Sequence, residues 1–287
     1  MKVTNIHSSW GSIIEFDDPM EVFNYDRAHW RKMIYERQLL VFKHMTFELK
    51  DYAHFGRLFG RPWRGHEYRT THEHPVGVRD KDGSVVHVSE FSNKLVKVIG
   101  DEEMMWHADI PNKTAKPFPH RALWIVKNPN GHISGKTRWL NIMLDECGRH
   151  LRPDQMALLD KVKIVQQSWY KPGTEIGTHD FIKTHPVTGK QSLRLNAYCG
   201  IMPGWDNLWI KGVVIDGVPQ NDCSLIGDFI STLVEIPELH YEHTWDYKDI
   251  AIYDNWSFIH GRSKIILNDG DDNERKFYRT NIDHLPD

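Results

Sequence analysis

The chain has 287 residues, of which 40% are hydrophobic, so it is long enough to bury a substantial core. Its 11 Trp, 10 Tyr and 12 Phe exclude a disordered chain, and its net charge of −3 offers no basic excess for a phosphate backbone. No apolar run approaches the ~20 residues that cross a bilayer, and the first residues lack the apolar stretch of a signal peptide. We therefore expect a globular protein that binds neither nucleic acid nor a membrane.

The cysteines and histidines bear on the compartment and on the chemistry. Cys147, Cys199 and Cys223 are odd in number and far apart, which does not indicate a disulfide framework. Reduced thiols are typical of the cytoplasm, so we expect a cytoplasmic protein. The 18 histidines are a large number for this length and are compatible with metal binding.

Helical patterns dominate the first part of the chain. The spacing of apolar residues predicts a helix that begins near residue 26 and runs into a short buried strand over residues 39–42. It predicts a second helix over 47–59, which ends at Gly60. Glycine is typical of the position just after a helix, because it adopts the left-handed conformation without strain.

After Gly60 the pattern changes to short apolar runs separated by turn residues. These runs predict strands over residues 84–88, 122–126, 162–167, 193–198 and 250–253. Two further helices are expected, over 143–159 with a restart at Pro153, and over 222–236. The sequence contains no repeat and no linker, so we expect one domain over residues 1–287. Many short strands with few helices indicate an antiparallel sandwich or barrel.

A candidate metal site begins with Trp106-His107-Ala108-Asp109. In an extended segment, residues two apart point to the same side, so His107 and Asp109 can place a nitrogen and an oxygen on one ion. Because chance often produces His-x-Asp among many histidines, a solvent-exposed loop or a core histidine is the alternative. A second histidine, His260, follows the strand predicted over 250–253. Two histidines and one carboxylate form a facial triad, which suits non-haem Fe(II) oxygenases and which zinc also accepts.

Two arginines follow the third candidate ligand. Arg275 and Arg279 lie four residues apart, so in a strand they face the same side. A buried guanidinium near a metal offers a fixed fork of donors for a carboxylate. The alternative is an exposed charged strand near the end of the chain. The short distance in sequence from His260 favours a role in the site.

The ordered set His107-x-Asp109, His260 and Arg275 resembles the taurine dioxygenase branch (TauD/TfdA) of the Fe(II)/2-oxoglutarate-dependent oxygenases. Four shorter motifs extend the resemblance from about residue 31 to residue 279. They are Gly135-Lys136-Thr137-Arg138-Trp139 for Gly-Gly-x-Thr-x-Trp, Thr184-His185-Pro186-Val187-Thr188-Gly189 for Thr-His-Pro-x-Thr-Gly, Tyr253-Asp254-Asn255 for Trp-Asp-Asn, and Arg275-x-x-x-Arg279 for Arg-x-x-x-Arg. The chain departs from the pattern at Lys136, where the family has a second glycine, and at Tyr253, where it has tryptophan.

The resemblance implies a mainly β fold with flanking helices and a double-stranded β-helix (jelly roll) core of the clavaminate synthase-like type. It implies that His107, Asp109 and His260 bind Fe(II), and that Arg275 and Thr137 bind the far carboxylate of 2-oxoglutarate. The reaction would consume O2 and 2-oxoglutarate and release succinate and CO2. Halogenating members of the family lack the carboxylate that stands here as Asp109, so the resemblance favours hydroxylation or a related oxidation.

The substrate is less visible in the sequence. By the same resemblance, Arg279 would contact an anionic group of a small molecule, and His66 lies where taurine-type enzymes place a substrate-binding histidine. Trp106 is a third candidate for the substrate pocket. For the loop around His66 an exposed polar loop is the alternative, and for Trp106 a core position is. The sequence determines neither the substrate nor the oligomeric state, and it leaves a homo-oligomer open.

Two other functions share parts of this pattern. A zinc-dependent hydrolase could use the same three ligands, with a metal-bound water as the nucleophile. It would not need Arg275 and Thr137 as a clamp for a dicarboxylate. A nonenzymatic ligand-binding jelly roll is the second alternative, but it would have no need of His107, Asp109 and His260 together.

Overall fold

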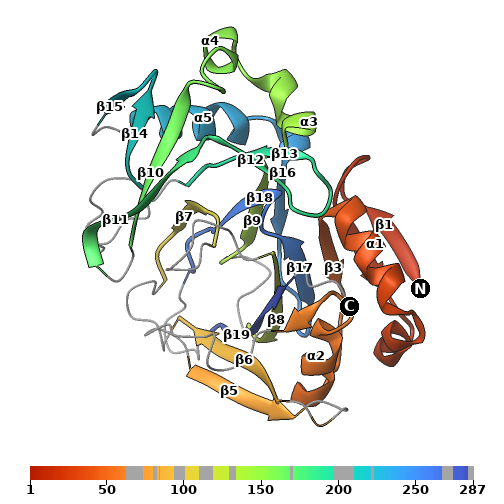
Figure 1. The fold of residues 1–287 in the computed structure, drawn as a ribbon. Coiled ribbons are helices and arrows are strands. Elements are labelled where there is room, and N and C mark those ends of the chain that lie inside the picture. Colours follow the sequence, from red (N-terminus) through yellow and green to blue (C-terminus); the bar gives the residue numbers. More distant parts are fainter. Residues whose placement is uncertain are drawn as a thin grey trace.

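The computed structural model describes residues 1–62, 74–79, 83, 85–93, 101–109, 119–128, 134–168, 171–196, 210–220, 223–266 and 274–283 (Figure 1). His66 and the loop around it lie outside these residues. So does Cys199. All other residues that the sequence singles out as site candidates are described.

The largest element is a nine-stranded sheet. Its path follows the order β1 (Lys2–Asn5), β2 (Ser12–Glu15), β3 (Leu39–Phe42), β17 (Ile250–Asp254), β8 (His120–Lys127), β19 (Lys276–Asp283), β6 (Val85–Ser92) and β5 (His74–Arg79), and β4 (Arg61–Pro62) pairs with β19. The pair β2–β3 is parallel and the other pairs in this sheet are antiparallel. Strands from both ends of the sequence therefore lie side by side at its centre.

A four-stranded sheet faces the large one, in the order β16 (His240–His243), β9 (Thr137–Asn141), β18 (Phe258–Arg262) and β7 (Met104–His107). Side chains alternate across it, as expected for strands. Trp139 and Phe258 pack against Leu39 and Ala251 of the large sheet, whereas Leu140 and Ile259 belong to a separate cluster on the other face. The two sheets thus form a sandwich, and His260 points into it because it shares a face with Phe258.

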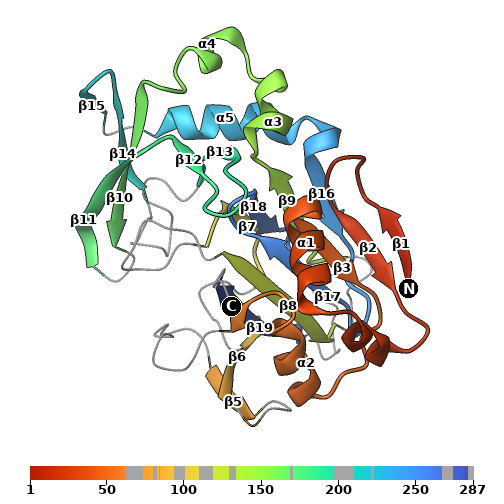
Figure 2. The ribbon, with the colours of Figure 1, turned by 45° about the vertical axis from the view of Figure 1, so that its right-hand side comes forward.

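The other face of the small sheet is covered by a helical layer and two smaller sheets (Figures 1 and 2). The helices are α3 (Leu144–Cys147), α4 (Pro153–Met156) and α5 (Ser224–Val234), and 3₁₀ turns span Gly148–His150 and Pro237–Leu239. The strands run in the order β11 (Lys171–Asp180), β10 (Val162–Ser168), β14 (Ile210–Ile215) and β15 (Val218–Gln220), beside the hairpin of β12 (Ile182–Thr184) and β13 (Gln191–Leu193). Phe229 of α5 packs against Phe181 with ring centroids 4.9 Å apart.

The early helices pack on the outside of the large sheet, as expected. A 3₁₀ turn, Pro19–Asn24, precedes α1 (Arg27–Arg37) and α2 (Leu49–Gly56). Asp26 caps α1 by accepting the His29 N–H at 2.8 Å, and Gln38 ends it in the left-handed region with φ of 65°. Trp30 of α1 and Phe55 of α2 are fully buried in one cluster with Phe42 of β3. The mainly β architecture with outer helices is confirmed.

Three predicted elements differ from the structure. The helix predicted over 143–159 restarts at Pro153, as predicted, because Pro153 forces Arg152 into an extended conformation, with ψ of 157°. Its two parts are shorter than predicted: α3 ends at Cys147 and is followed by a 3₁₀ turn, and α4 ends at Met156. Of the strand predicted over 193–198, Leu193 lies in β13, which pairs with the three residues of β12. Residues 194–196 lie in no strand, and residues 197 and 198 are outside the described residues. The second helix is shorter than predicted. It begins at Leu49, where Asp51 accepts the Glu48 N–H at 3.2 Å, and ends at Gly56.

The cysteines also differ from expectation. Cys147 is buried and has a free thiol, but Cys223, just before α5, is disulfide-bonded. The prediction that the cysteines are reduced is therefore wrong for Cys223. Across the described residues, the helices are all too short or too polar to cross a membrane.

The burial of Lys183, on β12, predicts how the stability of the protein changes with pH. It is 4% exposed, its ammonium lies 5.7 Å from the ring centroid of Trp256, and burial, with the charge of Arg194 adding to it, lowers its pKa to about 7. Between pH 7 and 10 the unfolded chain keeps a proton that the folded chain has lost, so the free energy of unfolding rises with pH across this window. We expect Lys183→Met to be more stable than the wild type by roughly 4 kcal/mol below pH 7, with the difference shrinking by up to ~1.4 kcal/mol per pH unit above it. Urea unfolding of both proteins from pH 6 to 9.5 measures this, and a difference that does not change with pH contradicts it.

Candidate functional site

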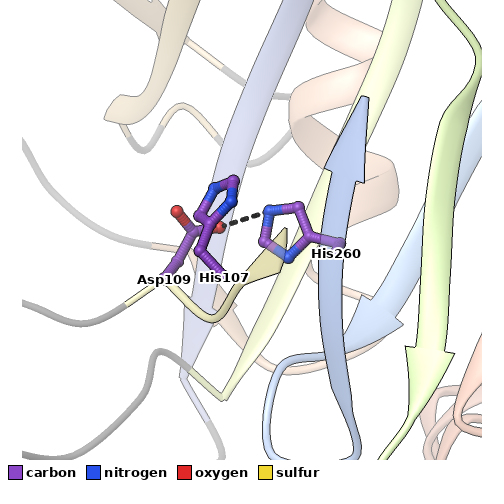
Figure 3. Close-up of side chains that lie close together, drawn as sticks. All are labelled: His107, Asp109 and His260. Carbon is purple, nitrogen blue, oxygen red and sulfur yellow. Dashed lines mark ion pairs between the residues drawn. The ribbon is translucent and has the colours of Figure 1, made fainter. Parts of the chain in front are cut away.

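His107, Asp109 and His260 come together between the nine-stranded sheet and the four-stranded sheet that faces it (Figure 3). One potential ligand atom from each lies within 4.8 Å of the other two, and all three residues are buried. His107 at the end of β7 pairs directly with His260 of β18, with ring centroids 4.3 Å apart. Nε2 of His260 lies 3.2 Å from Oδ2 of Asp109. The pairing of two short strands thus gathers residues that are far apart in the sequence.

Hydrogen bonds fix the imidazole of His107 and the backbone of Asp109. Nδ1 of His107 lies 2.7 Å from the carbonyl oxygen of Met105, which can only accept, so Nδ1 carries the hydrogen and Nε2 is left to bind a metal. The side-chain amide of Asn255 holds the backbone of Asp109 on both sides. Its Oδ1 accepts the Asp109 N–H at 3.2 Å, and its Nδ2 donates to the Asp109 carbonyl at 2.5 Å.

The electrostatics favour the metal-binding forms of these groups. Burial, together with the nearby His260, lowers the pKa of His107 to about 3, so its imidazole is neutral. Burial opposes the charge on Asp109, but Arg121 and the two histidines hold the pKa of its carboxyl below the usual range. Neutral imidazole and ionised carboxylate are the forms that bind divalent ions. Two nitrogens and one oxygen on one side of an ion fit Fe(II), and this donor set alone would also fit zinc.

A buried cation lies near the start of β19. Arg275 is 4% exposed, and its Nε and Nη2 have no hydrogen-bond partner among the described residues. Its guanidinium carbon lies 4.5 Å from the ring centroid of Phe277. Burial, reinforced by the charge of Arg262, moves the pKa of Arg275 well below its usual value. Because unpaired buried donors are costly, this arrangement indicates a site for an anionic ligand.

The motif around Gly135 provides the space for this guanidinium. Gly135 has φ of +64°, and a Cβ there would lie 3.1 Å from Nη1 of Arg275. Two residues on, the Oγ1 of Thr137 accepts a hydrogen bond from Nε1 of Trp245 at 2.8 Å, which leaves its hydroxyl hydrogen for a ligand. The ring of Trp245 packs on Phe277, with centroids 5.0 Å apart. Aromatic side chains therefore connect Thr137 to Arg275.

The predicted substrate residues are less closely grouped. Arg279 is half-buried on β19, with its guanidinium carbon 5.8 Å from the ring centroid of Phe91. Trp106 precedes His107 on β7 and therefore faces the opposite side of the strand. Its ring lies 5.4 Å from that of His240 and 4.9 Å from the guanidinium carbon of Arg138. The contacts of Arg279 and Trp106 with a substrate stay predictions, and His66 is not described.

The sequence interpretation assigned no role to several residues that support the site. Arg121 of β8 forms an ion pair with Asp109, although its only signal in the sequence is a charge just before an apolar run. His185, in the Thr-His-Pro-x-Thr-Gly motif, accepts the N–H groups of Val187 and Thr188 with Nδ1, at 3.1 Å each. Its Nε2 lies 3.0 Å from Oδ2 of Asp254. The motif therefore positions the turn that also carries Asn255.

Comparison with known proteins agrees with this geometry. The family profile described as "Taurine catabolism dioxygenase TauD, TfdA family" matches residues 2–281. No curated protein sequence matches. Solved structures with the same fold include a Burkholderia xenovorans protein described as an alpha-ketoglutarate-dependent taurine dioxygenase, with TM-score 0.68 and 20% identity over 98% of this chain and 88% of that one.

A taurine dioxygenase from Burkholderia xenovorans has TM-score 0.66 and 21% identity, covering 98% of this chain and 90% of its own. AAD-2, solved in complex with Mn(II) and N-oxalylglycine, has TM-score 0.65 and 15% identity, covering 98% of this chain and 96% of its own. These likenesses confirm the jelly-roll fold class. With the profile match over nearly the whole chain, they lead to one conclusion: the chain belongs to the TauD/TfdA family and is a non-haem iron dioxygenase that depends on Fe(II), 2-oxoglutarate and O2.

Proposed function

We propose that this enzyme hydroxylates an unactivated C–H bond of a small anionic molecule, with conversion of 2-oxoglutarate to succinate and CO2. The observation that carries the proposal is a buried two-histidine, one-carboxylate cluster in the same sandwich as the buried guanidinium of Arg275, whose Nε and Nη2 have no hydrogen-bond partner among the described residues. The cluster fits the metal, and the guanidinium fits the dicarboxylate cosubstrate.

In this proposal His107, Asp109 and His260 hold Fe(II). Bound Fe(II), with 2-oxoglutarate and O2, supplies the oxidising chemistry that no protein side chain provides. Three protein donors leave coordination positions open, so the protein's part is to orient the bound molecules and to exclude water. The presence of Asp109 favours hydroxylation over halogenation, since the carboxylate fills the position that a halide would need.

The far carboxylate of 2-oxoglutarate is assigned to Arg275 and Thr137. Arginine offers parallel donors that match both carboxylate oxygens, and the Thr137 hydroxyl adds a third hydrogen bond. Both side chains are buried, at 4% and 6% exposure, so the charge pair would be shielded from water. A bound carboxylate would satisfy the Arg275 donors that have no described partner.

The anionic character of the substrate is inferred from Arg279, which lies four residues after Arg275 on β19. We assign Arg279 and His66 to the substrate side, with Arg279 as the anion-binding group. Trp106 faces the opposite side of β7 from His107, so its contact with a substrate stays a prediction. A small-molecule substrate fits this class of enzyme. The cytoplasmic location and any homo-oligomer stay predictions.

The zinc hydrolase is the weaker alternative, although its three ligands would be the same. A hydrolase gives no role to Nε and Nη2 of Arg275, which have no partner in the described part of the chain, and the family match covers residues 2–281. The same match disfavours a nonenzymatic ligand-binding jelly roll.

A screen of succinate release tests the proposal. Purified enzyme with Fe(II), 2-oxoglutarate and O2 is offered sulfonates, aryloxy acids, amino acids and neutral analogues of matched size. We expect an anionic compound to stimulate succinate formation and to gain one oxygen atom by mass spectrometry. Stimulation only by neutral compounds would contradict the assignment of an anionic substrate, and hydrolysis of a substrate with zinc alone would contradict the oxygenase.

A further inference from the structure

Arg121 is a buried arginine of β8 that enters the metal site from the large sheet, opposite the strands of His107 and His260. It is 4% exposed, and its Nη1 forms an ion pair with Oδ2 of Asp109. Its Nε donates to Oδ1 of the buried Asn281 at 3.1 Å. Arg121 pairs with Tyr253 on one neighbouring strand and with Asn281 on the other, so both sides of its side chain are supported.

Tyr253 acts on the same carboxylate oxygen. Its hydroxyl donates to Oδ2 of Asp109 at 3.5 Å and lies 3.3 Å from Nε2 of His260. It is also hydrogen-bonded to the side chain of Arg121. A carboxylate offers about four lone-pair sites, so these bonds hold the group while leaving it free to bind a metal.

The orientation of this carboxylate needs such support. Asp109 lies beyond the end of β7, and Asn255 fixes only its backbone. The side-chain torsions of Asp109 are therefore set by what the carboxylate itself contacts. Groups that hydrogen-bond to a metal-binding carboxylate orient it for the ion.

We propose that Arg121 is a positioning residue that, with Tyr253, holds the Asp109 carboxylate in its metal-binding orientation. The inference rests on the proposed ligand set of His107, Asp109 and His260. The positive charge of Arg121 repels a nearby divalent ion, so on this ground its removal would strengthen metal binding. Its hydrogen bonds orient Asp109 for the ion, so on this ground its removal would weaken metal binding. Because Asp109 already neutralises the guanidinium, we expect the loss of orientation to dominate.

Mn(II) binding to the metal-free protein tests this without turnover. The electron paramagnetic resonance signal of free Mn(II) gives the affinity. Arg121→Met should weaken binding roughly 10–100-fold, and Arg121→Lys, which keeps the charge and one group of donors, should restore part of it. Asn281→Ala, which releases Nε of Arg121 without touching Asp109, should weaken binding less than Arg121→Met. Arg61→Gln breaks a more exposed arginine–aspartate ion pair, with Asp283, and should bind Mn(II) like the wild type.

A second readout reports the geometry at saturating metal. The visible absorption of bound Co(II) should change in Arg121→Met and stay unchanged in Arg61→Gln, because only the former alters the carboxylate that binds the ion. A merely structural role of Arg121 would lower the thermal stability of the metal-free protein and leave this spectrum unchanged.

The outcomes separate this inference from the ligand set. Unchanged or tighter Mn(II) binding by folded Arg121→Met overturns the role of Arg121. If that variant does not fold, Asn281→Ala decides, and wild-type affinity there overturns the role as well. His260→Ala should lose Mn(II) binding; if it binds like the wild type, the ligand set itself is wrong, whatever Arg121 does.

Discussion

Replacing Arg275 with alanine is expected to raise the 2-oxoglutarate concentration for half-maximal rate by ~100-fold or more. The guanidinium is 4% exposed, so a carboxylate bound to it would be taken out of water. Removing one partner of a buried charge pair leaves the other uncompensated, which costs roughly 3–5 kcal/mol. A tenfold change in affinity corresponds to about 1.4 kcal/mol. Initial rates measured against 2-oxoglutarate at saturating substrate give the effect.

Three measurements distinguish this role from a general loss of structure. Arg275→Lys keeps the charge but loses the fork, so its defect should be smaller than that of the alanine variant. Mn(II) binding in the absence of 2-oxoglutarate should be nearly unchanged in Arg275→Ala. Arg279→Ala, on the same strand, should chiefly weaken binding of the primary substrate. If only Arg279→Ala loses affinity for 2-oxoglutarate, the roles of the two arginines are reversed.

The local pattern of apolar residues predicted the buried strands at the centre of the large sheet. The buried strand over 39–42 is confirmed as β3, and 250–253 as β17, because uniformly apolar runs at the centre of a sheet are buried on both faces. The predictions differ from the structure where the end of a strand or a helix depends on residues outside the pattern. Residues 193–198 have a strand-like composition, but among the described residues of this range only Leu193 pairs with the short strand β12. The helix predicted over 143–159 restarts at Pro153 as predicted, because proline restricts Arg152 before it, but both of its parts are shorter than predicted.

The site likewise contains residues that the sequence predicts and residues that only the structure reveals. His107 and Asp109 could be assigned because two residues of one extended segment already share a side, and the resemblance supplied His260 and Arg275. Arg121 could not be found, because its contact with Asp109 depends on which strand lies opposite β7. Gly135 could be recognised as part of a motif, but its closeness to Arg275 is visible only once β9 and β19 are placed. Such contacts depend on register between distant strands, which one sequence does not encode locally.

Replacing any one of His107, Asp109 and His260 with alanine is expected to abolish turnover, with a loss of well over ~100-fold, and this is the largest effect predicted. Each replacement leaves the metal with two protein donors instead of three. Loss of an outer hydrogen-bond partner alone typically costs roughly 10–100-fold in metal affinity or activity, so loss of a ligand costs more. The three residues are buried, so no neighbouring surface group can take the vacant position without repacking the core.

Two further variants serve as controls for the alanine replacements. Asp109→Asn keeps the size of the side chain and the contacts of its backbone with Asn255, but removes the charge, so it should lose metal affinity while remaining folded. His240→Ala removes a half-buried histidine from the same four-stranded sheet, outside the cluster, and should bind Mn(II) like the wild type. Succinate formation coupled to substrate, and Mn(II) affinity of the metal-free proteins, measure both properties. Near-normal activity of His260→Ala would remove that residue from the ligand set. Because His107 and Asp109 come from one segment, the metal site would then need a third ligand from another strand.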